Sequence, residues 1–176
     1  MEHLYKGFLN IFKKEDTNRK GDKVVREVMS RSSDKNSDDS VAGIVYDNDK
    51  DIYYFVNQLR AGCKEEDKFL TEVVAGTLEN GEDPKICFKR ECKEEIGVNI
   101  EEIYMLPNPL YTSPGGTTER IFLFLSSGTK LWEGGGLESE QEDIEIIEVK
   151  SKDLKNFSKN IKDLKTSYLI NEILNS

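Results

Sequence analysis

Histidine and cysteine are scarce in this sequence of 176 residues, and their scarcity limits the chemistry that the chain can perform. The single histidine, His3, leaves too few nitrogen ligands for a zinc cluster. The three cysteines, Cys63, Cys87 and Cys92, form no paired disulfide framework. Reduced thiols are the simplest interpretation, and they predict a cytoplasmic protein.

Long apolar runs are also missing, as is any excess of basic charge. No stretch is long enough to cross a membrane, and the start MEHLYKGFLN lacks the charged, apolar and small-residue regions of a signal peptide. The 34 acidic residues outnumber the 25 basic ones and give a net charge of −9, which argues against nucleic acid as the main partner. An acidic protein that handles phosphates must therefore recruit cations.

The chain length suits one domain that mixes strands and helices. Strands are expected over 41–46 and 52–59, antiparallel and joined by a polar turn, and over 69–76. The apolar run 121–125 is expected at the centre of a sheet. The other expected elements are a hairpin around Lys20-Gly21-Asp22, an exposed loop over 31–40, strands over 100–106 and 144–149, a short helix over 152–157 capped by Ser151, and a C-terminal helix over 161–174.

The stretch 76–98, GTLENGEDPKICFKRECKEEIGV, gathers acidic residues at a junction between a loop and a helix. Asp83 and Pro84 are typical of a helix start. Glu91 and Glu95 then lie four residues apart on one helix face, where like charges repel by roughly 0.2–0.5 kcal/mol per pair. A divalent cation would relieve this repulsion. Because carboxylate oxygens select hard ions, Mg²⁺ is expected, with Mn²⁺ as an alternative.

A divalent cation suits a diphosphate ligand, and a further carboxylate could accept the proton of the attacking water. Residues around this site have expected roles of their own. Arg60, at the end of a predicted strand, suits a phosphate contact, with a surface ion pair as an equal alternative. Glu72 is expected to project toward a ligand. Arg90 is expected to hold its neighbouring carboxylates, and Cys92 to be a buried small hydrophobe.

Two loops beyond the helix carry further carboxylates. The first, 113–119, reads SPGGTTE and ends in Glu119. The second, 132–143, reads WEGGGLESEQED and combines three consecutive glycines with five carboxylates. A flexible acidic loop of this kind suits a lid over a metal site, and a solvated hairpin turn is its alternative.

These residues carry a resemblance to a known family. The complete signature of the Nudix hydrolases is similar to the pattern formed here by Gly76, Glu82, Arg90, Glu91, Cys92, Glu94, Glu95, Gly97 and Val98. The resemblance implies an α/β fold, the Nudix α/β/α sandwich with a mixed sheet. It also implies N-terminal strands over 1–40 and a Nudix hydrolase domain over 41–176.

Three segments outside the signature, EVVAG, YTSPGGTTE and GGGLESEQEDIEIIEV, resemble the branch that hydrolyses nucleoside diphosphate sugars. GDP-mannose hydrolases are the nearest likeness, with ADP-ribose and UDP-sugar pyrophosphatases as relatives. The resemblance implies a metal site made of Glu91, Glu95, the backbone carbonyl of Ala75, and Glu142. Two extra residues in the second loop leave Glu140 as an alternative ligand.

The resemblance also implies roles for residues around the metal. The implied catalytic residues are Glu119, Glu142, Glu94 and Arg90, and the implied substrate contacts are Arg60, Glu72, Gly115 and Gly116. Glu119 matches the position of the general base, although Glu142 and Glu140 remain alternatives for that role. Members of this branch are homodimers that exchange or share their N-terminal strands, which would give residues 1–40 a purpose.

The leading prediction is therefore a Mg²⁺-dependent pyrophosphatase that converts a nucleoside diphosphate sugar to a nucleoside monophosphate and a sugar phosphate. One alternative is a hydrolase of damaged, non-canonical nucleoside triphosphates. Another is a non-catalytic sensor of nucleotide sugars, for which degenerate signature carboxylates would be the sign. None of those carboxylates is degenerate here.

Overall fold

The computed structural model describes residues 2–31, 38–137 and 143–176, and its strands form two sheets. The smaller sheet contains β1 (Glu2–Lys6), β2 (Asn10–Thr17) and β3 (Lys23–Ser30), all antiparallel and in that order. The turn between β2 and β3 contains Gly21 at a φ of 88°, and Oδ1 of Asn18 accepts hydrogen bonds from two backbone N–H groups within it. The predicted hairpin is confirmed, and β1 adds a strand that the apolar pattern did not indicate.

The larger sheet has eight strands and is mixed. Its main path runs β11-β5-β4-β10-β8, while β6 pairs with β5, β7 with β4 and β9 with β10. The pair β10–β4 is parallel and the other pairs are antiparallel. The strands are β4 (Asp39–Asp47), β5 (Ile52–Leu59), β6 (Phe69–Glu72), β7 (Val74–Thr77), β8 (Val98–Met105), β9 (Leu110–Tyr111), β10 (Arg120–Lys130) and β11 (Glu145–Lys150). The apolar run 121–125 therefore lies in the central strand β10, as expected.

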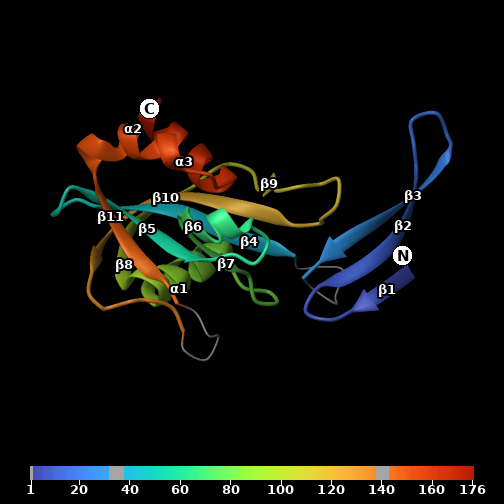
Figure 1. Cartoon of the computed structure of the whole chain (residues 1–176), viewed down its shortest axis with the longest axis horizontal. Helices are drawn as coiled ribbons and strands as arrows, with labels where there is room; N and C mark the ends of the chain where they lie inside the picture. The colour runs from blue at the N-terminus through green and yellow to red at the C-terminus, as the bar shows by residue number, and fades with distance from the viewer. Residues whose placement is uncertain (1, 32–37, 138–142) are drawn as a thin grey trace.

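Helices cover both faces of this sheet, which confirms the α/β/α sandwich (Figure 1). Helix α1 (Pro84–Ile96) packs on one face, while α2 (Leu154–Phe157) and α3 (Leu164–Leu174) pack on the other. Short 3-10 turns occupy Glu65–Asp67, Ser151–Asp153 and Ser158–Asn160.

An aromatic contact helps to set the approach of α1 to the sheet. The rings of Phe88 and Phe124 stack with their centroids 4.8 Å apart, and both side chains are fully buried. A Cβ at Gly43 would lie 2.4 Å from the ring of Phe88, so β4 needs glycine at this point. Burying each such ring stabilises the fold by about 1.5–3 kcal/mol.

Three sequence expectations are corrected by the structure. The strand expected over 69–76 breaks at Val73, because the chain there changes its partner from β5 to β4. Ser151 does not cap a helix but is the first residue of a 3-10 turn. Its backbone N–H donates to the carbonyl of Asp51 at 3.2 Å, just beyond the pairing of β11 with β5. The C-terminal helix begins at Leu164, because Asp163 is its N-cap.

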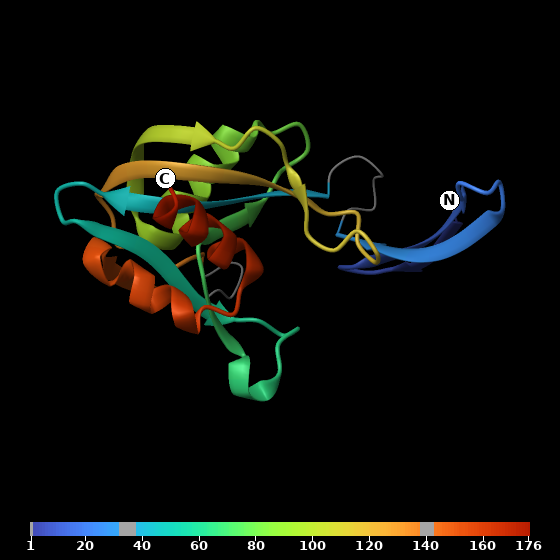
Figure 2. The same ribbon diagram turned by 90° about the horizontal axis from the view of Figure 1, so that it is seen from above.

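The smaller sheet projects away from the sandwich, as both views show (Figures 1 and 2). It meets the body where Met29 at the end of β3 forms a bridge with Thr117. Its apolar side chains include several that are well exposed, among them Tyr5, Val25 and Phe8, the last at 87%. No helix in the described parts of the chain is long and apolar enough to cross a membrane.

Candidate active site

Helix α1 begins and ends at the residues that the sequence indicated. Oδ1 of Asp83 accepts hydrogen bonds at 2.8 and 3.3 Å from two N–H groups of the first turn, where Pro84 has no N–H to leave unpaired. Gly97 ends the helix at a φ of 69°. A Cβ there would lie 2.1 Å from the carbonyl oxygen of Trp132, so conformation and space both require glycine.

Two carboxylates of α1 lie against strand β7. Glu95 is 3% exposed, and its Oε2 accepts a hydrogen bond from the N–H of Ala75 at 3.3 Å. Glu91 lies over Gly76, where an added Cβ would be 2.0 Å from its Oε1. The glycine that opens the signature thus leaves the space that the Glu91 side chain occupies. The structure brings the predicted metal ligands Ala75, Glu91 and Glu95 to one place.

Arg90 lies at the centre of the acidic cluster on α1. Its Nη1 contacts Glu91 at 2.7 Å and Glu94 at 3.2 Å, and its Nε and Nη2 donate to Glu82, both at 3.2 Å. Burial alone would lower the pKa of Arg90, but the hydrogen bond with Glu82 and the charge of Glu91 outweigh it and raise that pKa. The same hydrogen bond lowers the pKa of Glu82. The expectation that Arg90 holds its neighbouring carboxylates is confirmed.

The cysteines of α1 do not compete as ligands or nucleophiles. Burial raises the pKa of the Cys87 thiol to about 12 and that of Cys92 well above its usual value. Neither side chain therefore offers a thiolate near neutral pH. Cys92 is fully buried and packs among hydrophobic side chains, as the sequence predicted.

The donor set beside β7 is oxygen only, which suits a hard divalent cation. Within residues 2–31, 38–137 and 143–176, however, no three His, Cys, Asp or Glu side chains lie close enough together to hold a metal ion. A backbone carbonyl such as that of Ala75, or a further carboxylate, would have to complete the site. Glu142 and Glu140, the predicted candidates, lie outside the described residues.

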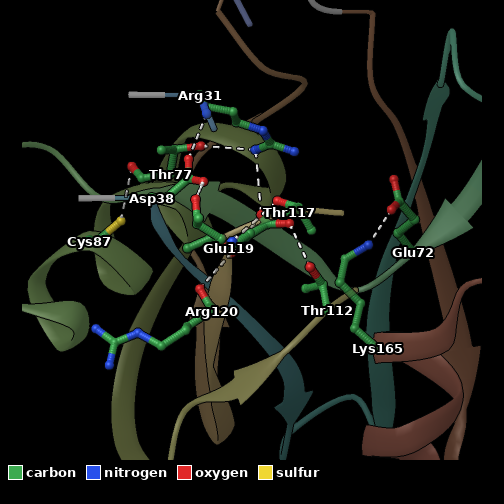
Figure 3. A network of polar contacts seen from close by, with 12 residues as sticks. Arg31, Asp38, Glu72, Thr77, Cys87, Thr112, Thr117, Glu119, Arg120 and Lys165 are labelled. Atoms are coloured by element: carbon green, nitrogen blue, oxygen red, sulfur yellow. Dashed lines mark hydrogen bonds and ion pairs between the residues drawn. The ribbon is translucent and has the colours of Figure 1, made fainter. Parts of the chain in front are cut away.

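Glu119 lies in a second polar network (Figure 3). Its carboxylate accepts hydrogen bonds from the hydroxyls of Ser40 at 3.1 Å and Thr112 at 3.0 Å. Nη1 of Arg31 lies 3.7 Å from Oε1 of Glu119 and donates to the hydroxyl of Thr77 at 3.2 Å. Because Thr77 is the last residue of β7, Glu119 is held at the end of the strand that also contacts α1.

The loop that carries Glu119 is attached to the smaller sheet. The N–H of Met29 donates to the carbonyl of Gly116 at 2.8 Å, and the N–H of Thr118 donates to the carbonyl of Met29 at 3.2 Å. A Cβ at Gly115 or Gly116 would meet no atom within 4 Å, so the surface beside both glycines is open. Their contact with substrate stays a prediction.

A third network of polar side chains lies where β6 ends. Nε of Arg60 donates to Oε2 of Glu72 at 2.5 Å, and Nζ of Lys165 contacts the other carboxylate oxygen (Figure 3). Glu72 is 3% exposed, so a buried carboxylate is compensated by two cations. Arg60 therefore makes the ion pair that the sequence offered as an alternative, and its contact with phosphate stays a prediction.

Lys165 and Arg31 are two residues of these networks that sequence reasoning did not single out. The C-terminal helix was expected from its apolar spacing, which does not single out Lys165. Asp163 at the helix start was the available indication, because a capping residue there is placed to bond backbone groups. Arg31 lies in a polar segment that resembles any exposed loop.

Comparison with known proteins agrees with this geometry. The Nudix domain profile matches residues 37–166. The chain is 34% identical over 143 residues to a GDP-mannose pyrophosphatase of Salmonella arizonae, covering 76% of this chain and 70% of that protein. It is 33% identical over 172 residues to the GDP-mannose pyrophosphatase of Escherichia coli K12, covering 92% and 85%. A crystal structure of an ADP compounds hydrolase has a TM-score of 0.76 over 99% of this chain and 89% of that chain, and at 13% identity this likeness concerns the fold alone.

Proposed function

Since this chain belongs to the Nudix family, we propose that it is a Mg²⁺-dependent pyrophosphatase that hydrolyses a nucleoside diphosphate sugar of the GDP-mannose or ADP-ribose type. The products are a nucleoside monophosphate and a sugar phosphate. The observation that carries the proposal is the placement of Glu91 and Glu95 against β7 on an intact signature helix. The GDP-mannose pyrophosphatases among its relatives support the substrate class.

The metal would be held by Glu91, Glu95 and the backbone carbonyl of Ala75, with Glu142 or Glu140 as a further ligand. A bound divalent cation would supply charge neutralisation on the diphosphate and a lowered pKa for the attacking water. Hydrolysis breaks the bond between the bridging oxygen and one phosphorus, and the water oxygen bonds to that phosphorus. The bridging oxygen leaves with the second phosphate.

Residues of the chain accept the proton of the attacking water and orient the substrate. Glu119 accepts the proton of the water, a role supported by the two hydroxyls and the arginine that hold its carboxylate at the end of β7. Glu142 and Glu140 are the alternatives for this role. Arg90 orients Glu91 and Glu94 through its two contacts from Nη1. Arg60, Glu72, Gly115 and Gly116 are assigned to the substrate side.

The test is a product analysis with three substrates. Purified protein is incubated with GDP-mannose, ADP-ribose or UDP-glucose, with Mg²⁺ or with EDTA, and nucleoside monophosphate is separated by anion-exchange chromatography. We expect Mg²⁺-dependent monophosphate from at least one substrate. If none of the three yields it, the proposal is wrong. Release of pyrophosphate from nucleoside triphosphates alone would favour the housekeeping hydrolase, and tight binding without turnover would favour the sensor.

A paired substitution tests the ligand assignment. Glu95→Gln keeps the shape of the side chain but removes its charge, so it should lower kcat about 100-fold or more. Glu102→Gln on the exposed side of β8 removes the same charge away from the site and should leave kcat unchanged. Full activity of Glu95→Gln at saturating Mg²⁺ would show that Glu95 is not a ligand.

The smaller sheet supports a homodimer. This sheet projects beyond the sandwich (Figure 2), and its apolar side chains, Tyr5 and Phe8 among them, are exposed. We assign residues 1–40 to strands shared between two subunits and 41–176 to the hydrolase domain. Light scattering after gel filtration should give twice the chain mass, and a monomer at micromolar concentration would contradict the assignment.

A further inference from the structure

The chain changes strand partner at one buried residue. Strand β6 pairs with β5 and strand β7 pairs with β4, so Val73 between them belongs to neither strand. A buried backbone N–H at such a switch must find a partner outside the ladder. The N–H of Val73 donates to Oγ1 of Thr166 at 2.9 Å, across 93 residues of sequence, and both residues are 0% exposed.

Thr166 is itself fixed by the start of α3. Oδ2 of Asp163, the N-cap residue, accepts hydrogen bonds from the N–H of Thr166 at 2.9 Å and from its hydroxyl at 2.6 Å. Because the hydroxyl donates its hydrogen to Asp163, it is left as an acceptor for Val73. The direction of both hydrogen bonds is therefore determined by the cap.

The same helix start also holds the residue before the switch. Nζ of Lys165 contacts Glu72 (Figure 3) and also lies 2.9 Å from Oδ1 of Asp163. Glu72 and Val73 are thus bound by residues 163–166, which we call the α3 clamp. The clamp acts on two consecutive residues, so it holds both the position and the direction of the chain where β7 begins.

The clamp lies close to the acidic cluster along the chain. Ala75, whose N–H reaches Glu95, follows Val73 by two residues, and Gly76, over which Glu91 lies, follows by three. A strand advances about 3.3 Å per residue, so these contacts lie roughly 7–10 Å from the clamp with no loop between them. A displacement at Val73 would therefore pass directly to Ala75 and Gly76.

We propose that Thr166 is a positioning residue, which fixes the strand switch at Val73 and so holds β7 in register with Glu91 and Glu95. The proposal rests on the proposed function for its effect on turnover. Its claim about the strand and about the affinity for a divalent cation is independent of the sugar and the nucleotide.

The experiment compares three variants of the full-length protein. Thr166→Val keeps the volume but removes the hydroxyl, Thr166→Ser keeps the hydroxyl, and Ile170→Val trims a buried side chain of the same helix without touching the clamp. The dissociation constant for Mn²⁺ is measured without nucleotide by electron paramagnetic resonance. Hydrogen exchange of the peptide that spans β7 is measured by mass spectrometry, and melting temperatures are recorded for all proteins.

Thr166→Val should raise the Mn²⁺ dissociation constant about tenfold, in the range expected when an outer residue that orients a ligand is lost. Its β7 peptide should exchange faster, whereas Thr166→Ser should stay within twofold of wild type in both measurements. Ile170→Val should lower the melting temperature but leave Mn²⁺ affinity within twofold. These results together would support a positioning role over a purely structural one.

Two results would overturn the inference. The first is that Thr166→Val keeps its Mn²⁺ affinity within twofold of wild type, and the second is that Ile170→Val weakens Mn²⁺ affinity as much as Thr166→Val does. If the wild type cleaves nucleotide sugars but Thr166→Val changes neither Mn²⁺ affinity nor hydrogen exchange of β7, the role of the clamp alone is refuted. The expected Mn²⁺ and exchange effects without cleavage of any nucleotide sugar would refute the substrate assignment alone. Failure of the wild type to bind Mn²⁺ would refute both.

Discussion

Replacing Gly76 with alanine tests whether the space beside α1 determines the position of Glu91, the proposed metal ligand. An added Cβ would lie 2.0 Å from Oε1, 2.1 Å from Cδ and 2.4 Å from Cγ of Glu91, whereas ordinary contacts begin at 3.4 Å. The Glu91 carboxylate must therefore move by about 1.4 Å, the difference between the shortest separation and an ordinary contact. A misplacement of about 1 Å costs roughly 100-fold in rate, so we expect kcat/KM to fall about 100-fold.

The fold should survive this substitution because the change is local. Gly76 is not among the glycines with positive φ, so alanine is compatible with its backbone. Reduced freedom of the unfolded chain would stabilise the variant by roughly 0.4–1 kcal/mol, and the displaced Glu91 side chain offsets that gain by about 0.5–1.5 kcal/mol. The melting temperature should therefore stay within about 4 °C of wild type.

The assay is steady-state release of nucleoside monophosphate over a range of Mg²⁺ concentrations. Part of the loss in Gly76→Ala should be recovered at high Mg²⁺, because a displaced ligand weakens metal affinity. Gly62→Ala is the matched control, since its Cβ would meet no atom within 4 Å, and it should behave as wild type. The reasoning is refuted if folded Gly76→Ala keeps more than half of the wild-type kcat/KM with an unchanged Mg²⁺ dependence.

Three further predictions concern α1, the residues that contact it and the cysteines. Arg90→Lys should lower kcat/KM about tenfold, because an ammonium cannot reproduce the guanidinium fork that reaches three carboxylates. It should also lower the free energy of unfolding by about 2 kcal/mol, which corresponds to a melting temperature lower by roughly 4–8 °C. Steady-state kinetics and calorimetry measure the two effects, and unchanged values would contradict the prediction. The lowered pKa of Glu82 means that its contact with Arg90 stabilises the fold above about pH 4.5, the ordinary value, and that this contribution is lost as pH falls through the lowered folded-state pKa. Urea unfolding of wild type and Glu82→Gln should therefore differ at pH 7 and converge toward pH 3; a constant difference would refute the linkage. A thiol reagent at pH 8 should modify Cys63 alone in the native protein, because Cys87 and Cys92 are buried, and all three cysteines after unfolding. Rapid labelling of two or more cysteines in the native protein would contradict this prediction.

Local patterns explain which elements could be predicted. The ends of α1 follow from Asp83-Pro84 and Gly97, whose capping chemistry acts within a few residues. The central place of β10 follows from its continuous apolar run, because only a strand buried on both faces suits such a run. The hairpin of β2 and β3 follows from its turn residues in the same way.

Long-range contacts explain the elements that could not be predicted. The break at Val73 is invisible in an apolar stretch, since it depends on which neighbouring strand each half contacts. Strand β1 is exposed along its whole length, and its two large apolar residues, Leu4 and Tyr5, are adjacent, so no apolar alternation marks it. The ion pair of Glu72 with Lys165 joins residues 93 positions apart, and nothing in the local sequence at either end indicates the other.

The sequence by itself determined that Glu91 and Glu95 share a helix face with Arg90 beside them, because the period of a helix is a local property. From this followed the expectation of an oxygen-rich site for a hard cation, while the signature residues carried the resemblance to the Nudix family. Only the tertiary structure decided that the missing side chain of Gly76 makes room for Glu91, and that Thr166 holds the strand on which this contact depends. The physical reason is that packing space and hydrogen bonds between distant residues exist only once the chain has folded.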